Sequence, residues 1–106
     1  MIAIPKGTVA FNEKEAYNIA RKFGHDSERK FVVKAQVQYP ARSKGVFREN
    51  GFKGGIHIVD THEEVKEVAG KMCGKHLVFP GGLADGLLVN SVLVMEYIEA
   101  MEKYFL

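Results

Sequence analysis

The chain has 106 residues, of which 46% are hydrophobic and 26% are charged, and its formal net charge is +2. This length indicates one domain with a modest core, and the composition excludes an intrinsically disordered segment. The small net charge does not by itself favour a nucleic-acid binder, which would show a strongly salt-dependent affinity.

The first predicted unit is a strand followed by a helix. We predict a short strand over Gly7 to Phe11. Asn12 is a suitable N-cap, and Glu15 follows three residues later, as a capping box requires. Gly24 favours the left-handed backbone that commonly ends a helix. We therefore expect a helix over about residues 13–23 with one apolar stripe toward the core. The stripe residues recur at i, i+3, i+4 and i+7: Ala16, Ile19, Ala20 and Phe23.

The next predicted strand, Phe31 to Val37, carries a lysine in its middle. Its side chains alternate between two faces, one of which is wholly apolar. The other face carries Val32, Lys34 and Gln36. An unpaired charge in the middle of a sheet is costly, so we expect an anionic group to meet Lys34. A lysine on the water-facing side of a half-covered sheet would show the same pattern, and this alternative stays open.

A basic, glycine-containing loop follows this strand. It holds Arg42, Lys44, Arg48 and Lys53 against a single acid, Glu49. This combination suits a polyphosphate ligand. An ordinary solvated loop remains the alternative, because runs of charge usually form solvated faces.

The strand-to-helix unit then occurs a second time. Ile56 to Val59 predicts a strand with Ile56 and Ile58 inward and His57 outward. Thr61 and Glu64 form a second capping box, and Gly74 ends the second helix. The second apolar stripe has the same spacing as the first: Val65, Val68, Ala69 and Met72.

Two further strands are predicted toward the end of the chain. Lys75 to Phe79 is short, and Leu88 to Tyr97 is long, apolar and branched, which predicts one buried strand. Residues 98–106 are compatible with a helix or with a loop that enters another strand. The order β-α-β-β-α-β plus a further strand predicts an α+β fold, with two helices on one face of a mixed or antiparallel sheet.

Several other site chemistries have no support in the sequence. Cys73 is the only cysteine, so no internal disulfide is possible, and none of the four histidines stands at zinc-ligand spacing. Neither a Walker A loop nor a dinucleotide fingerprint is present. No apolar run reaches the roughly 18 residues of a membrane span, and the first residues lack the pattern of a signal or transit peptide. We expect no metal ligands in this chain, and neither a membrane nor a nucleic acid as its partner.

Residues 32–78, VVKAQVQYPARSKGVFRENGFKGGIHIVDTHEEVKEVAGKMCGKHLV, resemble the nucleotide-binding region of the succinyl-CoA ligase (succinate–CoA ligase) β subunit. That family has a VVKAQV strand, an AGGRGKG loop, a GGV strand and a helix that ends before GKxLV. The resemblance runs from about Ile4 to the C-terminus. It implies an ATP-grasp fold, with residues 1–106 as a single domain that forms the small lobe of a longer β subunit.

The resemblance also implies the binding residues by position. Lys34 resembles the lysine that contacts the nucleotide phosphates, and Glu96 resembles the acid beside the base and ribose. The loop residues that it implies are Ala41, Arg42, Ser43 and Lys44.

This chain departs from the family pattern at several of these positions. Pro40, Ala41 and Ser43 stand where the family has glycines around the loop arginine, and Lys103 replaces a second acid. Proline has no N–H to donate, and the added Cβ atoms obstruct a close approach of the backbone to phosphates. The alternative is therefore a diverged module that is not catalytic. Such a module would bind a nucleotide weakly or contact another subunit.

The activity that the resemblance implies belongs to a larger assembly. It is the formation of succinyl-CoA from succinate and CoA with ATP or GTP and Mg²⁺, through a phosphohistidine on an α subunit. The metal ligands, the large lobe and the α subunit lie outside this chain, so we expect no catalytic residue in it and no activity from it alone. The implied location is the mitochondrial matrix or a related organelle in a eukaryote, and otherwise the cytoplasm.

Overall fold

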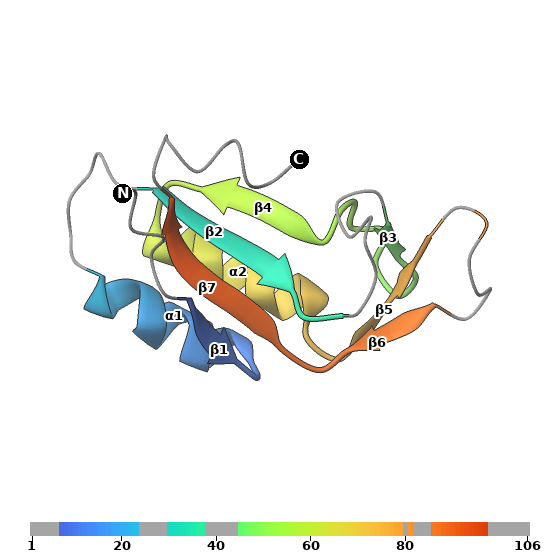
Figure 1. The fold of residues 1–106 in the computed structure, drawn as a ribbon, viewed down its shortest axis with the longest axis horizontal. Helices are drawn as coiled ribbons and strands as arrows, with labels where there is room; N and C mark the ends of the chain where they lie inside the picture. The colour runs from blue at the N-terminus through green and yellow to red at the C-terminus, as the bar shows by residue number, and fades with distance from the viewer. Residues whose placement is uncertain (1–6, 24–29, 38–44, 80, 82–85, 98–106) are drawn as a thin grey trace, which may run out of the picture.

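The computed structural model describes residues 7–23, 30–37, 45–79, 81 and 86–97. It confirms an α+β fold (Figure 1). The elements in chain order are β1 (Thr8–Ala10), α1 (Glu13–Lys22), β2 (Lys30–Ala35), β3 (Val46–Phe47), β4 (Ile56–Val59), α2 (His62–Met72), β5 (Lys75–Val78), β6 (Leu87–Val89) and β7 (Val92–Tyr97).

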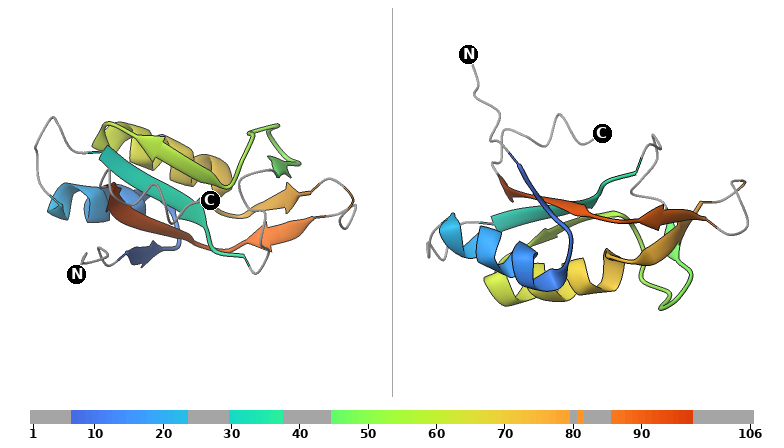
Figure 2. Two further views of the ribbon diagram at one scale, coloured as in Figure 1. Left: turned by 45° about the horizontal axis from the view of Figure 1, so that its top comes forward. Right: turned by 90° about the horizontal axis from the view of Figure 1, so that it is seen from below.

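The described strands form two sheets rather than the single sheet that the sequence predicts. One has four strands in the order β1-β7-β2-β4, and the other has three in the order β3-β5-β6. Every pairing of strands is antiparallel. Both helices cover the same face of the four-stranded sheet, as expected (Figure 2).

The prediction of one strand over Leu88 to Tyr97 is wrong. The strand is interrupted at Asn90 and Ser91, so β6 belongs to the small sheet and β7 to the large one. At this crossing the Ser91 carbonyl accepts a hydrogen bond from the Gln36 amide at 3.0 Å. These two short polar residues carry the chain from one sheet to the other.

Both predicted N-caps are present at the helix starts, but each glutamate bonds a neighbouring group in place of the N-cap amide: Glu15 Oε1 accepts from the Phe11 amide at 2.8 Å, and Glu64 Oε1 accepts from Thr61 Oγ1 at 3.2 Å. Asn12 Oδ1 accepts from the Glu15 amide at 2.9 Å, and Thr61 Oγ1 accepts from the Glu64 amide at 3.1 Å. Each cap satisfies an amide that has no partner within its helix. Gly74 follows α2 with a φ of 78°, a left-handed backbone that favours glycine. The predicted stop at Gly24 lies outside the described residues.

The core lies between the helices and the four-stranded sheet. The apolar face of β2 is buried there as predicted, and Phe47 and Leu77 extend the same cluster into the small sheet. The helix stripes contribute their predicted residues, either buried in this cluster or packed against it: Ala16, Ile19, Ala20, Phe23, Val65, Val68, Ala69 and Met72.

The predicted orientation of β4 is wrong. His57 lies opposite Val33, whose side chain is in the helix-side core, so His57 shares that side. Ile58 lies opposite Val32 on the other face and is 47% exposed. Three of the four β4 residues are apolar, so the sequence pattern could not decide which face is inward. The register against β2 decides it.

Candidate functional site

The face of the four-stranded sheet that points away from α1 and α2, called here the far face, carries an aliphatic patch. Val32 and Met95 are buried at 0% and 5% exposure. Ile56, Leu93 and Tyr97 are partly buried and pack against them. The far face therefore carries a small apolar cluster, separate from the main core, on three adjacent strands, of which Ile56, Leu93 and Tyr97 keep some exposure.

Lys34 lies within this patch. Its position in β2 is opposite Ile56 of β4 and opposite Leu93 of β7, so all three side chains share the far face. Lys34 is partly buried. The structure thus places its ammonium group on the side of the sheet away from the helices, as the sequence predicts. A charge beside aliphatic neighbours is less screened by water than one on an open surface, so it attracts anions more strongly.

Glu96 lies on the opposite side of the sheet. It pairs with Phe31, whose ring lies 5.3 Å from the ring of His62 at the start of α2. Strand alternation therefore places Glu96 on the helix side and its neighbour Met95 on the far face. The structure does not bring Glu96 and Lys34 onto one face, and the role of Glu96 beside a base and ribose stays a prediction.

The four predicted loop residues, Ala41, Arg42, Ser43 and Lys44, lie outside the described residues. The undescribed segment covers residues 38–44, and Ala35 before it and Gly45 after it both hydrogen-bond to one glycine pair. The Ala35 amide donates to the Gly55 carbonyl at 2.7 Å, and the Gly54 amide donates to the Gly45 carbonyl at 2.6 Å. A Cβ at Gly45 would come 2.6 Å from Cδ1 of the buried Leu77, so any other residue here would displace that side chain.

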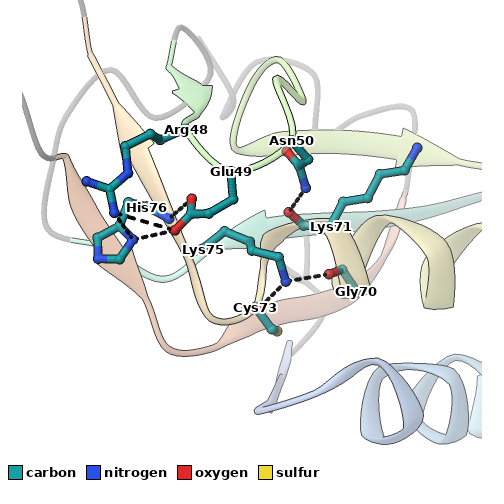
Figure 3. A network of polar contacts seen from close by, with 8 residues as sticks. All are labelled: Arg48, Glu49, Asn50, Gly70, Lys71, Cys73, Lys75 and His76. Carbon is teal, nitrogen blue, oxygen red and sulfur yellow. Dashed lines mark hydrogen bonds and ion pairs between the residues drawn. The ribbon is translucent and has the colours of Figure 1, made fainter.

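A polar cluster around Glu49 and His76 was not foreseen from the sequence (Figure 3). Glu49 accepts hydrogen bonds from the His76 amide at 2.8 Å and from His76 Nδ1 at 2.5 Å. The side-chain hydrogen bond from His76 and then the backbone one lower the pKa of Glu49 to about 2. Arg48, predicted as part of the basic loop, lies 3.8 Å from the same carboxylate. The one available signal was that Glu49 is the single acid among the loop's cations.

A hollow of about 370 Å³ lies near the start of α1 and the end of α2. Phe11, Cys73 and Asn90 are among its lining residues, and none of the predicted site residues lines it. Burial raises the pKa of the Cys73 thiol. A raised pKa disfavours the reactive thiolate, which agrees with a packing role for this cysteine.

The described residues lack the features of two other classes of site. Among the described residues, no group of three histidines, cysteines or acids is placed to hold a metal ion. Within the same part of the chain, no helix is both long and apolar enough to cross a membrane.

Comparison with known proteins identifies the family. The ATP-grasp domain model matches residues 1–106. The mitochondrial β subunit of ADP-forming succinate–CoA ligase from Columba livia is 39% identical over 104 residues, which are 98% of this chain and 24% of that protein. The GDP-forming mitochondrial β subunit from Dictyostelium discoideum is 44% identical over 75 residues, 70% of this chain and 18% of that protein.

A relative from a different organelle gives the same result. The hydrogenosomal β subunit of the ADP-forming ligase from Neocallimastix frontalis is 39% identical over 101 residues, 95% of this chain and 22% of that protein. The chain spans about a quarter of the length of these curated relatives or less. Because the ATP-grasp domain model matches its whole length, the chain belongs to the ATP-grasp domain family, and the relatives named here are succinate–CoA ligase β subunits.

Proposed function

We propose that residues 1–106 form one domain, the small nucleotide-binding lobe of a succinate–CoA ligase β subunit. The relatives named above support this, because their similarity extends over most of the chain. The observation that carries the proposal is the position of Lys34, partly buried on the far face between Ile56 and Leu93.

The chemistry of the far face fits a nucleoside triphosphate. The partly exposed members of the aliphatic patch, Ile56, Leu93 and Tyr97, would offer apolar contact to a base. The ammonium group of Lys34 would neutralise phosphate oxygens through charge-assisted hydrogen bonds. Arg42 and Lys44, with the backbone of Ala41 and Ser43, would add contacts from the loop. ATP or GTP would bring Mg²⁺, whose protein ligands lie outside this chain.

Phosphoryl transfer depends mainly on positioning and charge stabilisation, so a lobe of this kind contributes by holding the triphosphate. The parent reaction consumes succinate, CoA and a nucleoside triphosphate, and yields succinyl-CoA, the diphosphate and phosphate through a phosphohistidine on an α subunit. It needs that subunit and a large lobe, so this chain alone should not catalyse it. The mitochondrial and hydrogenosomal relatives support an organelle as the location in a eukaryote.

A second candidate is a diverged module that is not catalytic and that binds a nucleotide weakly or contacts another subunit. Pro40, Ala41 and Ser43 favour it, since they stand where the family's loop has glycines. The register of β7 favours it as well, because it places Glu96 on the helix side of the sheet.

A nucleotide titration separates the two candidates. The isotope-labelled chain is titrated with Mg-ATP and with Mg-GTP while backbone NMR shifts are followed. We expect shifts at Val32, Lys34 and Leu93, and none at Val68, which is buried on the helix side. No shift at millimolar nucleotide would refute the first candidate and leave the second only as a module that contacts another subunit.

A further inference from the structure

We propose that Gly7 is a positioning residue for nucleotide binding, because it lets the side chain of Leu93 lie over β1 and not over Lys34. This role rests on the proposed function, in which Lys34 meets the phosphates. Gly7 directly precedes β1 and is outside the set of predicted binding residues. Its contribution is the space that a side chain at this position would fill.

The branched end of Leu93 occupies that space. A Cβ built on Gly7 would come 2.5 Å from Leu93 Cγ and 2.7 Å from each of the two Cδ atoms. Leu93 lies opposite Val9 of β1, and Gly7 is two residues before Val9, so strand alternation places both on the far face. Gly7 and Leu93 are therefore diagonal neighbours, which long side chains can bridge.

This position turns the end of Leu93 away from Lys34. β7 lies between β1 and β2 in the sheet, and Leu93 is opposite Val9 on one side and opposite Lys34 on the other. A group that lies over Gly7 is on the β1 side of β7. The Cβ of Leu93 thus stays beside Lys34, while its methyl groups extend in the opposite direction.

The backbone at position 7 does not itself require glycine, because Gly7 is not among the glycines with a positive φ. An alanine could adopt the same backbone, but its Cβ would displace Leu93 from above β1. Val9 already stands on that strand, and the buried Met95 fills the next far-face position along β7. We therefore expect Leu93 to turn to another staggered rotamer, across β2 and over Lys34.

A leucine side chain over Lys34 would weaken the binding of an anion. Its methyl groups would stand where phosphate oxygens approach the ammonium group, and a charge-assisted hydrogen bond needs a short distance between nitrogen and oxygen. Gly7 therefore keeps the charge of Lys34 accessible by leaving Leu93 a place over the neighbouring strand.

A double-mutant cycle tests this role. Gly7→Ala is made in the wild-type chain and in the Leu93→Ala chain, and the affinity for Mg-ATP is measured by NMR titration. We expect Gly7→Ala to lower the affinity at least about fivefold in the wild-type chain, because the contact of Lys34 is disturbed. In the Leu93→Ala chain the same change should lower it less than about twofold, because no branched group is left to be displaced.

The reactivity of Lys34 gives a second readout that needs no nucleotide. The acetyl ester of N-hydroxysuccinimide acylates lysines, and peptide mass spectrometry follows the rate at each one. Gly7→Ala should slow acylation of Lys34, and adding Leu93→Ala should restore the rate. Lys30, exposed on the same strand, should react equally in all chains. A general loosening of the fold would speed the reaction of Lys34 instead.

Gly70→Ala is the matched control. A Cβ at Gly70 would also come within 2.5 Å of a side-chain atom, Glu13 Oε2, but Gly70 is in α2, on the other side of the sheet from Lys34 (Figure 2). The affinity for Mg-ATP and the acylation rate of Lys34 should both equal those of wild type.

The outcomes separate this role from the proposed function. If wild type binds Mg-ATP and Gly7→Ala binds it equally well, or loses the same factor in both backgrounds, the role of Gly7 is refuted while the proposed function stands. If wild type binds no nucleotide, both fall.

Should Gly7→Ala not fold, nuclear Overhauser effects in wild type decide. We expect strong effects between the Leu93 methyl groups and the Hα atoms of Gly7, and weak ones to the Hε atoms of Lys34. Effects to Lys34 as strong as those to Gly7 would overturn the inference.

Discussion

Replacement of Lys34 by methionine tests the binding face most directly. Methionine keeps an apolar stem against Ile56 and Leu93 and removes only the charge. A charge-assisted hydrogen bond contributes about 1.5–3 kcal/mol, and 1.4 kcal/mol is a factor of ten, so Lys34→Met should weaken Mg-ATP binding about 10- to 150-fold. The upper part of this range is expected because Lys34 is partly buried. The free energy of unfolding should change by less than about 1 kcal/mol.

Lys30→Met is the matched control. Lys30 is in the same strand and on the same face, four residues or about 13 Å away, which exceeds a Debye length of about 8 Å at physiological salt. It is exposed and lies 3.6 Å from Asp60. Its substitution should reduce affinity by less than about threefold. Affinity is measured by NMR titration and stability by urea denaturation. Equal losses in the two variants would show that general positive charge, and not a built site, attracts the nucleotide.

Three further predictions concern the fold. Asn12→Ala and Thr61→Ala should each lower the free energy of unfolding by about 1 kcal/mol in urea denaturation, because each removes an N-cap. Phe47→Ala should lower it by about 3–5 kcal/mol in the same assay, because Phe47 is fully buried where the small sheet joins the core. The pKa of Glu49, lowered to about 2 by His76, predicts that stability falls as the pH drops from about 4.3 toward 2, since the unfolded chain binds the proton first. Glu49→Gln should flatten this part of a plot of the urea midpoint against pH.

Exposed residues of the same kinds serve as controls for these changes. Asn18→Ala, on the exposed side of α1, should not destabilise the chain, and a loss equal to that of Asn12→Ala would contradict the capping argument. The carboxylate of Glu67 makes an exposed ion pair with Lys71, so Glu67→Gln should not change how steeply the urea midpoint falls between about pH 4.3 and 2. If the urea midpoint of Glu49→Gln still falls as steeply at low pH as that of wild type, other carboxylates cause the loss of stability in acid.

Local structure was predictable where neighbours in sequence are neighbours in space. The N-caps of both helices act within four residues, and the apolar stripes follow from 3.6 residues per turn. The placement of Lys34 on the face opposite the helices followed in the same way, because Phe31 and Val33 on alternate positions fix the inward face of β2.

The remaining features depended on partners distant in sequence. The hydrogen bonds between Glu49 and His76 join residues 27 apart, and no local pattern indicates them. The same is true of the junction at Gly54, where glycine content alone could not show that Ala35 and Gly45 converge on one dipeptide.

The sequence by itself determined the two helices, the family and the lysine in the middle of its strand, because periodicity and capping are encoded within a few residues. Only the tertiary structure decided that His57 faces inward, that Glu96 lies across the sheet from Lys34, and that the last strand is divided between two sheets. The physical reason is that strand alternation has a period of two, so the inward face of a short apolar strand is set by its register against a neighbouring strand.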